Sequence, residues 1–210
     1  TFGDTHGQVV DETYRRPQPP AYLSYYDETK YLAHLAAEER IAAGAPVLIA
    51  MPGMVYGPGD HSQVGGILRQ AMAGTLTVLS AADLGGSLVH VDDVAAGILL
   101  VHDRGQIGQS YVLGGEITSL RELVRRAAAV AGRQPPQLTA PSWMLRGLAP
   151  LGSLLGPVLG GEPNLGETIR ASVGVTYWAS SEKAKRDLGY APRDLETGLR
   201  TLLASTDDPG

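Results

Sequence analysis

The sequence YYDETK, residues 25–30, opens a segment that we expect to be a helix from Tyr26 to Ala43. Tyr26 and Lys30 are four residues apart, so a helix places their side chains on one face, one turn from each other. A free phenol loses its proton at about pH 10, and a neighbouring cation favours the phenolate. A Tyr–Lys pair at this spacing is therefore a compact unit for proton transfer near neutral pH.

The same spacing also occurs by chance on solvent-exposed helices, so the residues that follow decide between the two interpretations. Residues 46–51 read PVLIAM, a short apolar run that is typical of a strand buried on both faces of a parallel sheet. The run ends in PGMVYGPGD, residues 52–60, which we interpret as a loop. Open α/β sheets bind ligands at the carboxyl ends of buried strands, which favours a ligand-binding role for this loop.

The remaining pattern alternates helices and strands, which predicts an α/β fold. Ser119 and Glu122 have the spacing of a capping box and open the clearest helix, which Gly132 ends. In the first helix we expect Leu32, Leu35 and Ala36 to form a buried stripe. The other expected helices are 67–73, 94–102, 163–172, 182–188 and a last one from 195, and the other expected strands are 76–79, 88–91, 110–113 and 137–139.

Composition argues against several classes of protein. The 17 Lys and Arg residues against 22 Asp and Glu give a net charge of −5, and no basic block suggests a nucleic-acid partner. The absence of Cys excludes disulfides and thiolate metal sites, and it agrees with a reducing compartment, so we expect a cytoplasmic protein.

Residues 141–161 are apolar, but Arg146, Pro150 and Pro157 interrupt them, which favours a buried or lid-like helix pair over a membrane span.

Five blocks of sequence, in this order along the chain, resemble the extended short-chain dehydrogenase/reductases. The blocks are Tyr26-x-x-x-Lys30, PGMVYGPGD at 52–60, VHVDDVA at 89–95, SEKA at 181–184 and LGYAP at 188–192. Within these enzymes the sequence is similar to the NAD-dependent epimerase/dehydratase family and its dihydroflavonol-reductase-like group. The resemblance implies the carboxyl-terminal portion of a Rossmann-like, doubly wound parallel sheet with a small, mostly helical substrate lobe.

The resemblance also implies roles for individual residues. Tyr26 would be the general acid/base, exchanging a proton with a substrate hydroxyl or carbonyl while the nicotinamide of NAD or NADP exchanges hydride. Lys30 would hydrogen-bond the nicotinamide ribose and favour the phenolate of Tyr26. Four residues would lie along the nicotinamide, with backbone groups that meet its carboxamide: Pro52, Gly53, Met54 and Val55.

Three further residues are candidates for substrate contacts, each with an ordinary alternative. Tyr56 either lines the substrate pocket or packs in the core. His61 and Arg69 either contact a substrate phosphate or sugar, or belong to a solvated loop and helix face. Relatives commonly have Arg where Met51 stands, which leaves the substrate contacts open.

His90, Asp92 and Asp93 lie close enough in sequence to suggest a metal site, but their position at a strand-to-helix junction explains them more simply. We expect Asp92 and Asp93 to cap a helix and His90 to satisfy a local backbone group. We therefore predict no metal.

The family's Gly-rich turn, which binds the dinucleotide pyrophosphate, has no counterpart in this sequence. We therefore expect the amino-terminal half of the family's domain to be missing. Phe2-Gly3 resembles the family's aromatic-Gly pair, so the Ser or Thr that holds the substrate oxygen a few residues before that pair would lie just before Thr1. Residues 1–115 would then complete an NAD(P)-binding domain with interleaved substrate-lobe segments. Residues 116–210 would form most of the substrate lobe and the closing helices.

The expected function is that of an NAD(P)-dependent epimerase/dehydratase acting on a nucleotide sugar or a related hydroxyl or carbonyl substrate. The alternatives are an NAD(P)H-dependent ketone reductase and a non-catalytic dinucleotide sensor on the same fold. The residues present are expected to be inactive alone. The family suggests a homodimer through the Tyr26 helix, with a small-molecule substrate and neither a nucleic-acid nor a membrane partner.

Overall fold

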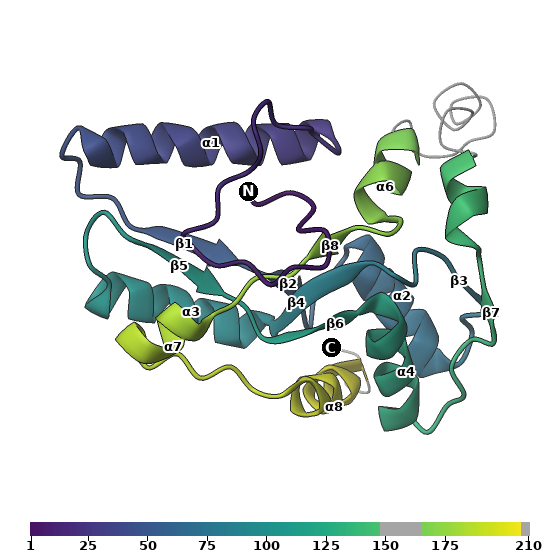
Figure 1. Ribbon diagram of the computed structural model, residues 1–210. Coiled ribbons are helices and arrows are strands. Elements are labelled where there is room, and N and C mark those ends of the chain that lie inside the picture. Colours follow the sequence, from purple (N-terminus) through teal and green to yellow (C-terminus); the bar gives the residue numbers. More distant parts are fainter. Residues whose placement is uncertain (148–164, 207–210) are drawn as a thin grey trace.

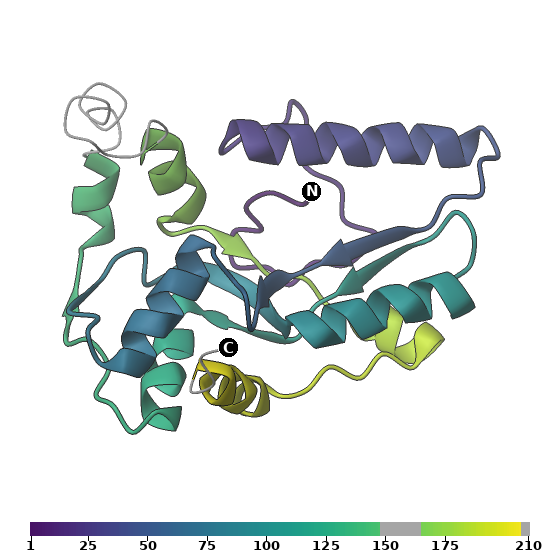
Figure 2. The same ribbon diagram turned by 180° about the vertical axis from the view of Figure 1, so that it is seen from behind.

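The computed structural model describes residues 1–147 and 165–206. Strands form a central layer, with the long helix α1 (Tyr25–Ala42) on one side and α3 (Val91–Arg104) and α7 (Glu182–Leu188) on the other (Figure 1). The same layers are seen from behind in Figure 2. The α/β class predicted from the sequence is confirmed.

Most strand pairs in the described part of the chain are parallel. The pairs are β1 (Ile49–Pro52) with β5 (Ser110–Leu113), β2 (Met54–Tyr56) and β8 (Thr176–Tyr177) with β4 (Gly85–His90), and β3 (Val78–Leu79) with β7 (Leu138–Thr139). The exception is β6 (Glu116–Ser119), which pairs antiparallel with β4. Strand β4 is buried along its whole length, as expected for a strand with neighbours on both sides.

Gly53 is the point where the chain passes from one sheet to the next. Its N–H donates to the carbonyl of Leu113 at the end of β5, at 3.1 Å, and the next residues pair with β4. A Cβ at this position would overlap the backbone oxygen of Ser87, so only glycine fits. The expectation that 52–60 is one loop was therefore wrong, because residues 54–56 continue as strand β2.

The remaining helices include two whose predicted capping residues make the expected hydrogen bonds. They include α2 (Gln63–Ala73), α4 (Leu120–Val130), α6 (Leu165–Ser172) and α8 (Leu195–Thr206), and residues 142–147 are also helical. Ser119 accepts the N–H of Glu122 and Asp194 accepts the N–H of Thr197, as their positions suggest. Helix α2 begins four residues earlier than expected, since Ser62 accepts the N–H of Gly65.

Burial differs from expectation in two elements. Helix α1 buries Asp27 and Tyr31, whereas Leu32 of the expected apolar stripe is 49% exposed. Strand β1 is half-buried rather than buried on both faces, and its last residue, Pro52, is exposed. In the described ranges β1 pairs on one edge only, with β5, which accounts for its partial exposure.

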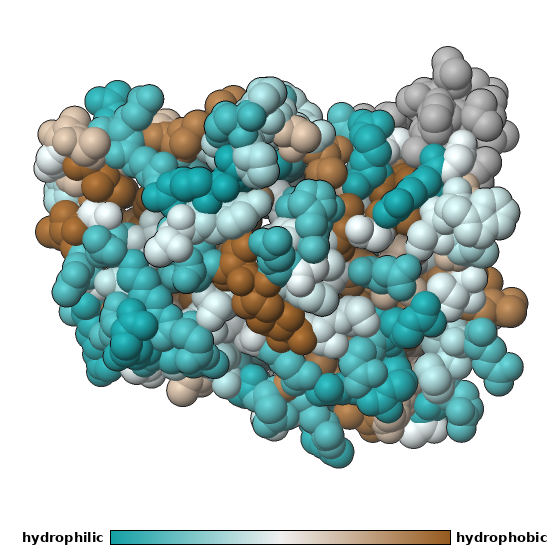
Figure 3. Space-filling model, viewed as in Figure 1, coloured by the Kyte–Doolittle hydropathy of each residue, from teal (hydrophilic) through white to brown (hydrophobic). Residues whose placement is uncertain are grey.

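In the part of the chain that the structure describes, three groups of buried apolar residues hold the layers together. The largest packs α2, α4 and α8 around β4, and its members Leu68, Leu123 and Leu199 are fully buried. A second lies between α3, β5 and α7, and a third joins Val10 and Ala179 to the middle of β5. Figure 3 shows that the face of the molecule seen in Figure 1 is mostly hydrophilic, with apolar side chains in separate groups. None of the helices described is long and apolar enough to cross a membrane. Residues 148–161 of the expected helix pair lie outside the described residues.

Candidate active site

Tyr26 and Lys30 lie together on the first turns of α1. Ser24 caps the helix, its Oγ accepting the N–H of Asp27 at 3.2 Å, which starts the helix at Tyr25. The Nζ of Lys30 lies 5.4 Å from the centroid of the Tyr26 ring. Both side chains face solvent, and Tyr26 is 70% exposed. A cation is thus held beside an accessible phenol, as the four-residue spacing predicts.

The start of α1 lies toward the carboxyl end of β1 in both views of the ribbon (Figures 1 and 2). Pro52 ends β1 and is exposed, while Gly53, Met54 and Val55 are half-buried. The N–H of Gly53 is already bonded to Leu113, so a ligand at this edge would meet other backbone groups. Pro52 and its neighbours therefore offer an open edge of the sheet near the Tyr–Lys turn.

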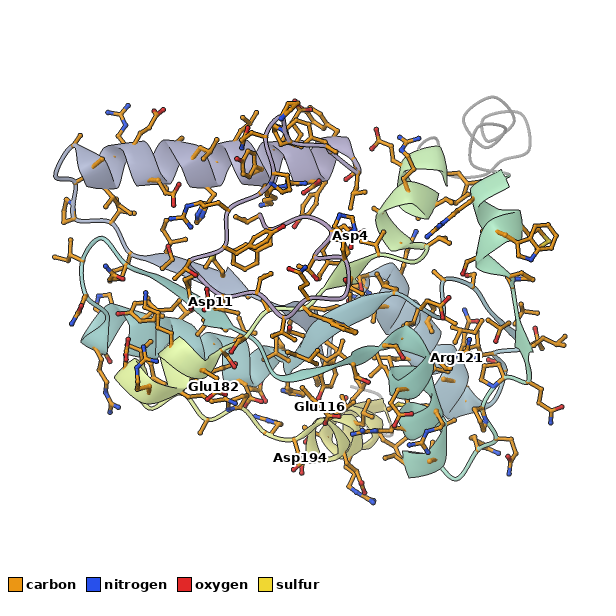
Figure 4. The ribbon with its side chains drawn as sticks, in the orientation of Figure 1. Asp4, Asp11, Glu116, Arg121, Glu182 and Asp194 are labelled. Carbon is orange, nitrogen blue, oxygen red and sulfur yellow. The ribbon has the colours of Figure 1, made fainter. Side chains whose placement is uncertain are left out.

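A cavity of about 490 Å³ lies beside the start of α1. The Tyr25 N–H donates to Glu167 of α6 at 3.3 Å, which brings α6 against the beginning of α1. The cavity is lined by both charged and apolar residues: Asp4, Leu23, Arg146, Ile169, Arg170, Val173, Gly174 and Val175. Asp4 accepts the backbone N–H of Thr176 in β8 (Figure 4). Among the described residues, two guanidinium groups and one carboxylate thus line a space next to the candidate catalytic turn.

A larger cavity, of about 630 Å³, lies between the amino-terminal loop and α7. Its lining includes Asp11 and Glu182, both labelled in Figure 4, and Gln109, which precedes β5. It is therefore at the amino end of β5, whereas Gly53 meets the carboxyl end of that strand. Ligands of open α/β sheets bind at carboxyl ends, so the smaller cavity is the better candidate for a substrate.

The three residues predicted to contact the substrate do not line the smaller cavity. Tyr56 is 1% exposed and packs edge-on against His90 in the core, and burial raises the pKa of its phenol. This placement favours the packing role for Tyr56. His61 and Arg69 are exposed, and Arg69 donates to the backbone oxygen of Asp60. The cavity is lined instead by Asp4, Arg146 and Arg170, which sequence reasoning did not single out as binding residues.

His90 caps helix α3, a position that was expected for the aspartates. Its Nδ1 accepts the N–H of Asp92 at 3.3 Å, and burial lowers the pKa of the imidazole. Asp92 and Asp93 belong to the first turn, and Asp93 binds Arg193 before α8. Among residues 1–147 and 165–206, no group of three or more His, Asp and Glu side chains could hold a metal ion.

Comparison with known proteins agrees with this fold. The chain belongs to the NAD-dependent epimerase/dehydratase family, whose sequence model matches residues 1–114. The family resemblance inferred from the sequence is thereby confirmed.

Two curated relatives are reductases by name. A Synechocystis protein provisionally named dihydroflavonol 4-reductase is 28% identical over 200 residues, which cover 92% of this chain and 57% of that protein. The 2-alkyl-3-oxoalkanoate reductase of Stenotrophomonas maltophilia is 27% identical over 203 residues, which cover 90% of this chain and 60% of the reductase. The chain thus spans less than two thirds of the length of either relative.

Solved structures show the same fold. A nucleoside-diphosphate-sugar epimerase from Pseudomonas aeruginosa superposes with a TM-score of 0.73 at 26% identity, covering 97% of this chain and 62% of the epimerase. A dTDP-glucose 4,6-dehydratase from Streptomyces venezuelae, solved with NAD bound, has a TM-score of 0.70 at 21% identity. That superposition covers 99% of this chain and 57% of the dehydratase.

Proposed function

We propose that the protein containing this chain is an NAD(P)-dependent oxidoreductase of the epimerase/dehydratase type, with Tyr26 as general acid/base. The observation that carries the proposal is the position of the Lys30 Nζ, 5.4 Å from the Tyr26 ring, on an exposed helical turn. Two further features support it: the exposed end of β1 at Pro52 and the cavity between the start of α1 and α6.

In this proposal the two side chains move one proton. When bound, the nicotinamide accepts or donates the hydride. The phenolate oxygen of Tyr26 removes the proton of the substrate hydroxyl as the alcohol is oxidised to a carbonyl, and it returns a proton in the reverse direction. The ammonium of Lys30 would favour the phenolate by electrostatic attraction and would hydrogen-bond the ribose of a bound nicotinamide. Tyr26 is exposed, and so are Lys30 and Pro52, two of the residues proposed to hold the nicotinamide.

The pyrophosphate of the cofactor needs a partner that these 210 residues do not supply. A strand, a G-x-x-G-x-x-G turn and a helix normally bind it through backbone N–H groups. We therefore propose that residues beyond this chain complete the cofactor site. Within the chain, residues 1–115 would mainly bind the cofactor and residues 116–210 would mainly bind the substrate.

A homodimer through α1 belongs to the same proposal, since Tyr25 and Leu32 expose 72% and 49% of their surface.

The proton-transfer role is tested by replacing Tyr26 with Phe in the full-length protein. We expect hydride transfer, followed by nicotinamide absorbance, to fall at least about a hundredfold because the general acid/base is lost. Tyr25→Phe is the matched control, since Tyr25 is the neighbouring residue and is similarly exposed. Full activity of Tyr26→Phe with a nucleotide sugar or a ketone would refute the role of Tyr26. An unchanged cellular function of Tyr26→Phe would favour the sensor.

We infer a candidate substrate class from Arg146 and Arg170. Two guanidinium groups favour an anionic substrate such as a nucleotide sugar, since each can bind phosphate oxygens. The names of the reductase relatives favour the second candidate, a ketone reductase. Kinetics with nucleotide sugars and with neutral ketones separate the two.

For a nucleotide sugar we expect Arg170→Gln to raise KM about tenfold and Arg186→Gln, in the other cavity, to leave it unchanged. An unchanged KM in Arg170→Gln would remove this cavity from the substrate site.

A further inference from the structure

Arg16 and Asp27 form a buried ion pair directly beneath the candidate catalytic turn. The Nη1 of Arg16 donates to Oδ1 of Asp27 at 3.0 Å and Nη2 donates to Oδ2 at 2.8 Å. The two side chains are only 5% and 9% exposed. Two parallel hydrogen bonds between a guanidinium and a carboxylate fix both the distance and the orientation of the partners.

The surroundings of the pair satisfy its remaining polar groups. Arg16 also donates to the backbone oxygen of Ala21, at 2.9 Å, and its guanidinium carbon lies 5.4 Å and 5.0 Å from the ring centroids of Tyr22 and Tyr31. The chain approaches the guanidinium so closely at Gly3, which has a φ of +68°, that a Cβ there would collide with it. A buried pair that lost one member would leave an uncompensated charge, so this arrangement couples Arg16 tightly to α1.

The position of Asp27 in the helix gives the pair a second consequence. Asp27 lies next to Tyr26 and three residues before Lys30, a spacing at which Asp and Lys ordinarily form an ion pair on a helix surface. Here both carboxylate oxygens bind Arg16, and Oδ2 also accepts the N–H of Leu23 at 3.1 Å. The ammonium of Lys30 lies instead over the ring of Tyr26.

We propose that Arg16 is a positioning residue, which withholds the Asp27 carboxylate from Lys30 and so leaves the ammonium directed at Tyr26. The inference rests on the proposed function, because it explains how Lys30 stays available to the phenol and the cofactor. Arg16 touches neither reacting group and acts only through Asp27.

Other charged groups face this turn and stay constant in the test. Glu28 lies on the same helix, and Glu167 on α6 accepts the N–H of Tyr25. Asp4 lines the neighbouring cavity.

The test is a charge-removal cycle in the full-length protein. In Arg16→Gln, Asp27 is free to pair with Lys30, so we expect kcat at neutral pH to fall about tenfold and its pH profile to move about one unit higher. In the double variant Arg16→Gln/Asp27→Asn no competing carboxylate remains, and activity and profile should return to within about threefold of the parent. Arg16→Lys keeps the cation and should retain the parent profile even if its melting temperature drops. Arg15→Gln, at an exposed arginine, is the control.

The outcomes separate this inference from the proposed function. Ionisation of Tyr26 is followed without turnover by ultraviolet difference titration of each variant against the same variant carrying Tyr26→Phe. A titration that moves in Arg16→Gln and returns in the double variant supports the inference, even if Tyr26→Phe proves fully active and the proposed function fails. A double variant as impaired as Arg16→Gln, or a lower melting temperature with an unmoved titration, would show that the pair is structural only.

If Arg16→Gln does not fold, the other two variants decide. Parent-like titrations of Arg16→Lys and of the double variant support the inference, and a shifted titration of the double variant overturns it.

Discussion

At the scale of single residues, Glu122 shows how local contacts set a pH dependence. Its carboxylate accepts hydrogen bonds from Arg125 and Arg126, which lower its pKa to about 2. The folded pKa is below the unfolded value of 4.5, so the stabilisation is fully present above that pH and is lost as the pH falls toward 2.

We therefore expect Glu122→Gln to lower the free energy of unfolding by about 1 kcal/mol at pH 7, because these partly exposed contacts are screened by solvent. Urea unfolding at several pH values measures this, and the difference from the parent should vanish near pH 2. A difference that stays constant with pH would mean that the carboxylate charge is not responsible.

The residue scale also shows what sequence can and cannot assign. The Tyr26–Lys30 contact followed from helix periodicity alone. Tyr56 could not be assigned, because its burial depends on β2 pairing with a strand more than thirty residues later. Pairing of Asp27 with Lys30 is what helix spacing favours, and the competing contact with Arg16 depends on the path of the preceding loop.

At the scale of elements, the backbone at Gly53, between β1 and β2, leaves no room for a side chain. Gly53→Ala places a methyl group on the backbone oxygen of Ser87, so we expect a loss of about 2–3 kcal/mol in the free energy of unfolding. Gly66→Ala in α2 is the control, since its Cβ would meet only the end of the Arg69 side chain, 4.0 Å away, and it should be neutral or stabilising by up to about 1 kcal/mol. Equal stabilities for the two variants in chemical denaturation would contradict the close approach of β2 to β4.

Elements with a strong local signal were predicted well. Strand β5 has the predicted bounds, and α4 and α7 follow their caps within a residue. Strands β6 and β8 were missed, because they are short, half-buried and set by pairing with β4 rather than by their own pattern.

At the scale of the whole molecule, the candidate substrate cavity joins parts of the chain that no local pattern connects. Asp4, Arg146 and Arg170 meet because β8 returns beside the amino-terminal segment. Family resemblance supplied the fold and the order of the motifs, and the three-dimensional contacts supplied the lining of this cavity.

Cofactor affinity is a property of the whole protein in this account. The 210 residues contain the proposed nicotinamide side of the site and no pyrophosphate-binding turn, so we expect NADH to bind them with a Kd weaker than about 1 mM. A fluorescence titration of NADH with residues 1–210 measures this, with the full-length protein as the control. Micromolar binding by residues 1–210 would mean that the pyrophosphate is held by groups that we have not assigned.

The central claim is that Tyr26 and Lys30 act as one proton-transfer unit, and a double-mutant cycle in the full-length protein tests it most directly. The measurement is the single-turnover rate of hydride transfer in Tyr26→Phe, in Lys30→Met and in the variant with both changes. Residues that act as a unit are strongly non-additive, so the double variant should be within about threefold of Tyr26→Phe. Losses that multiply, or a Tyr26→Phe variant as fast as the parent, would contradict the account.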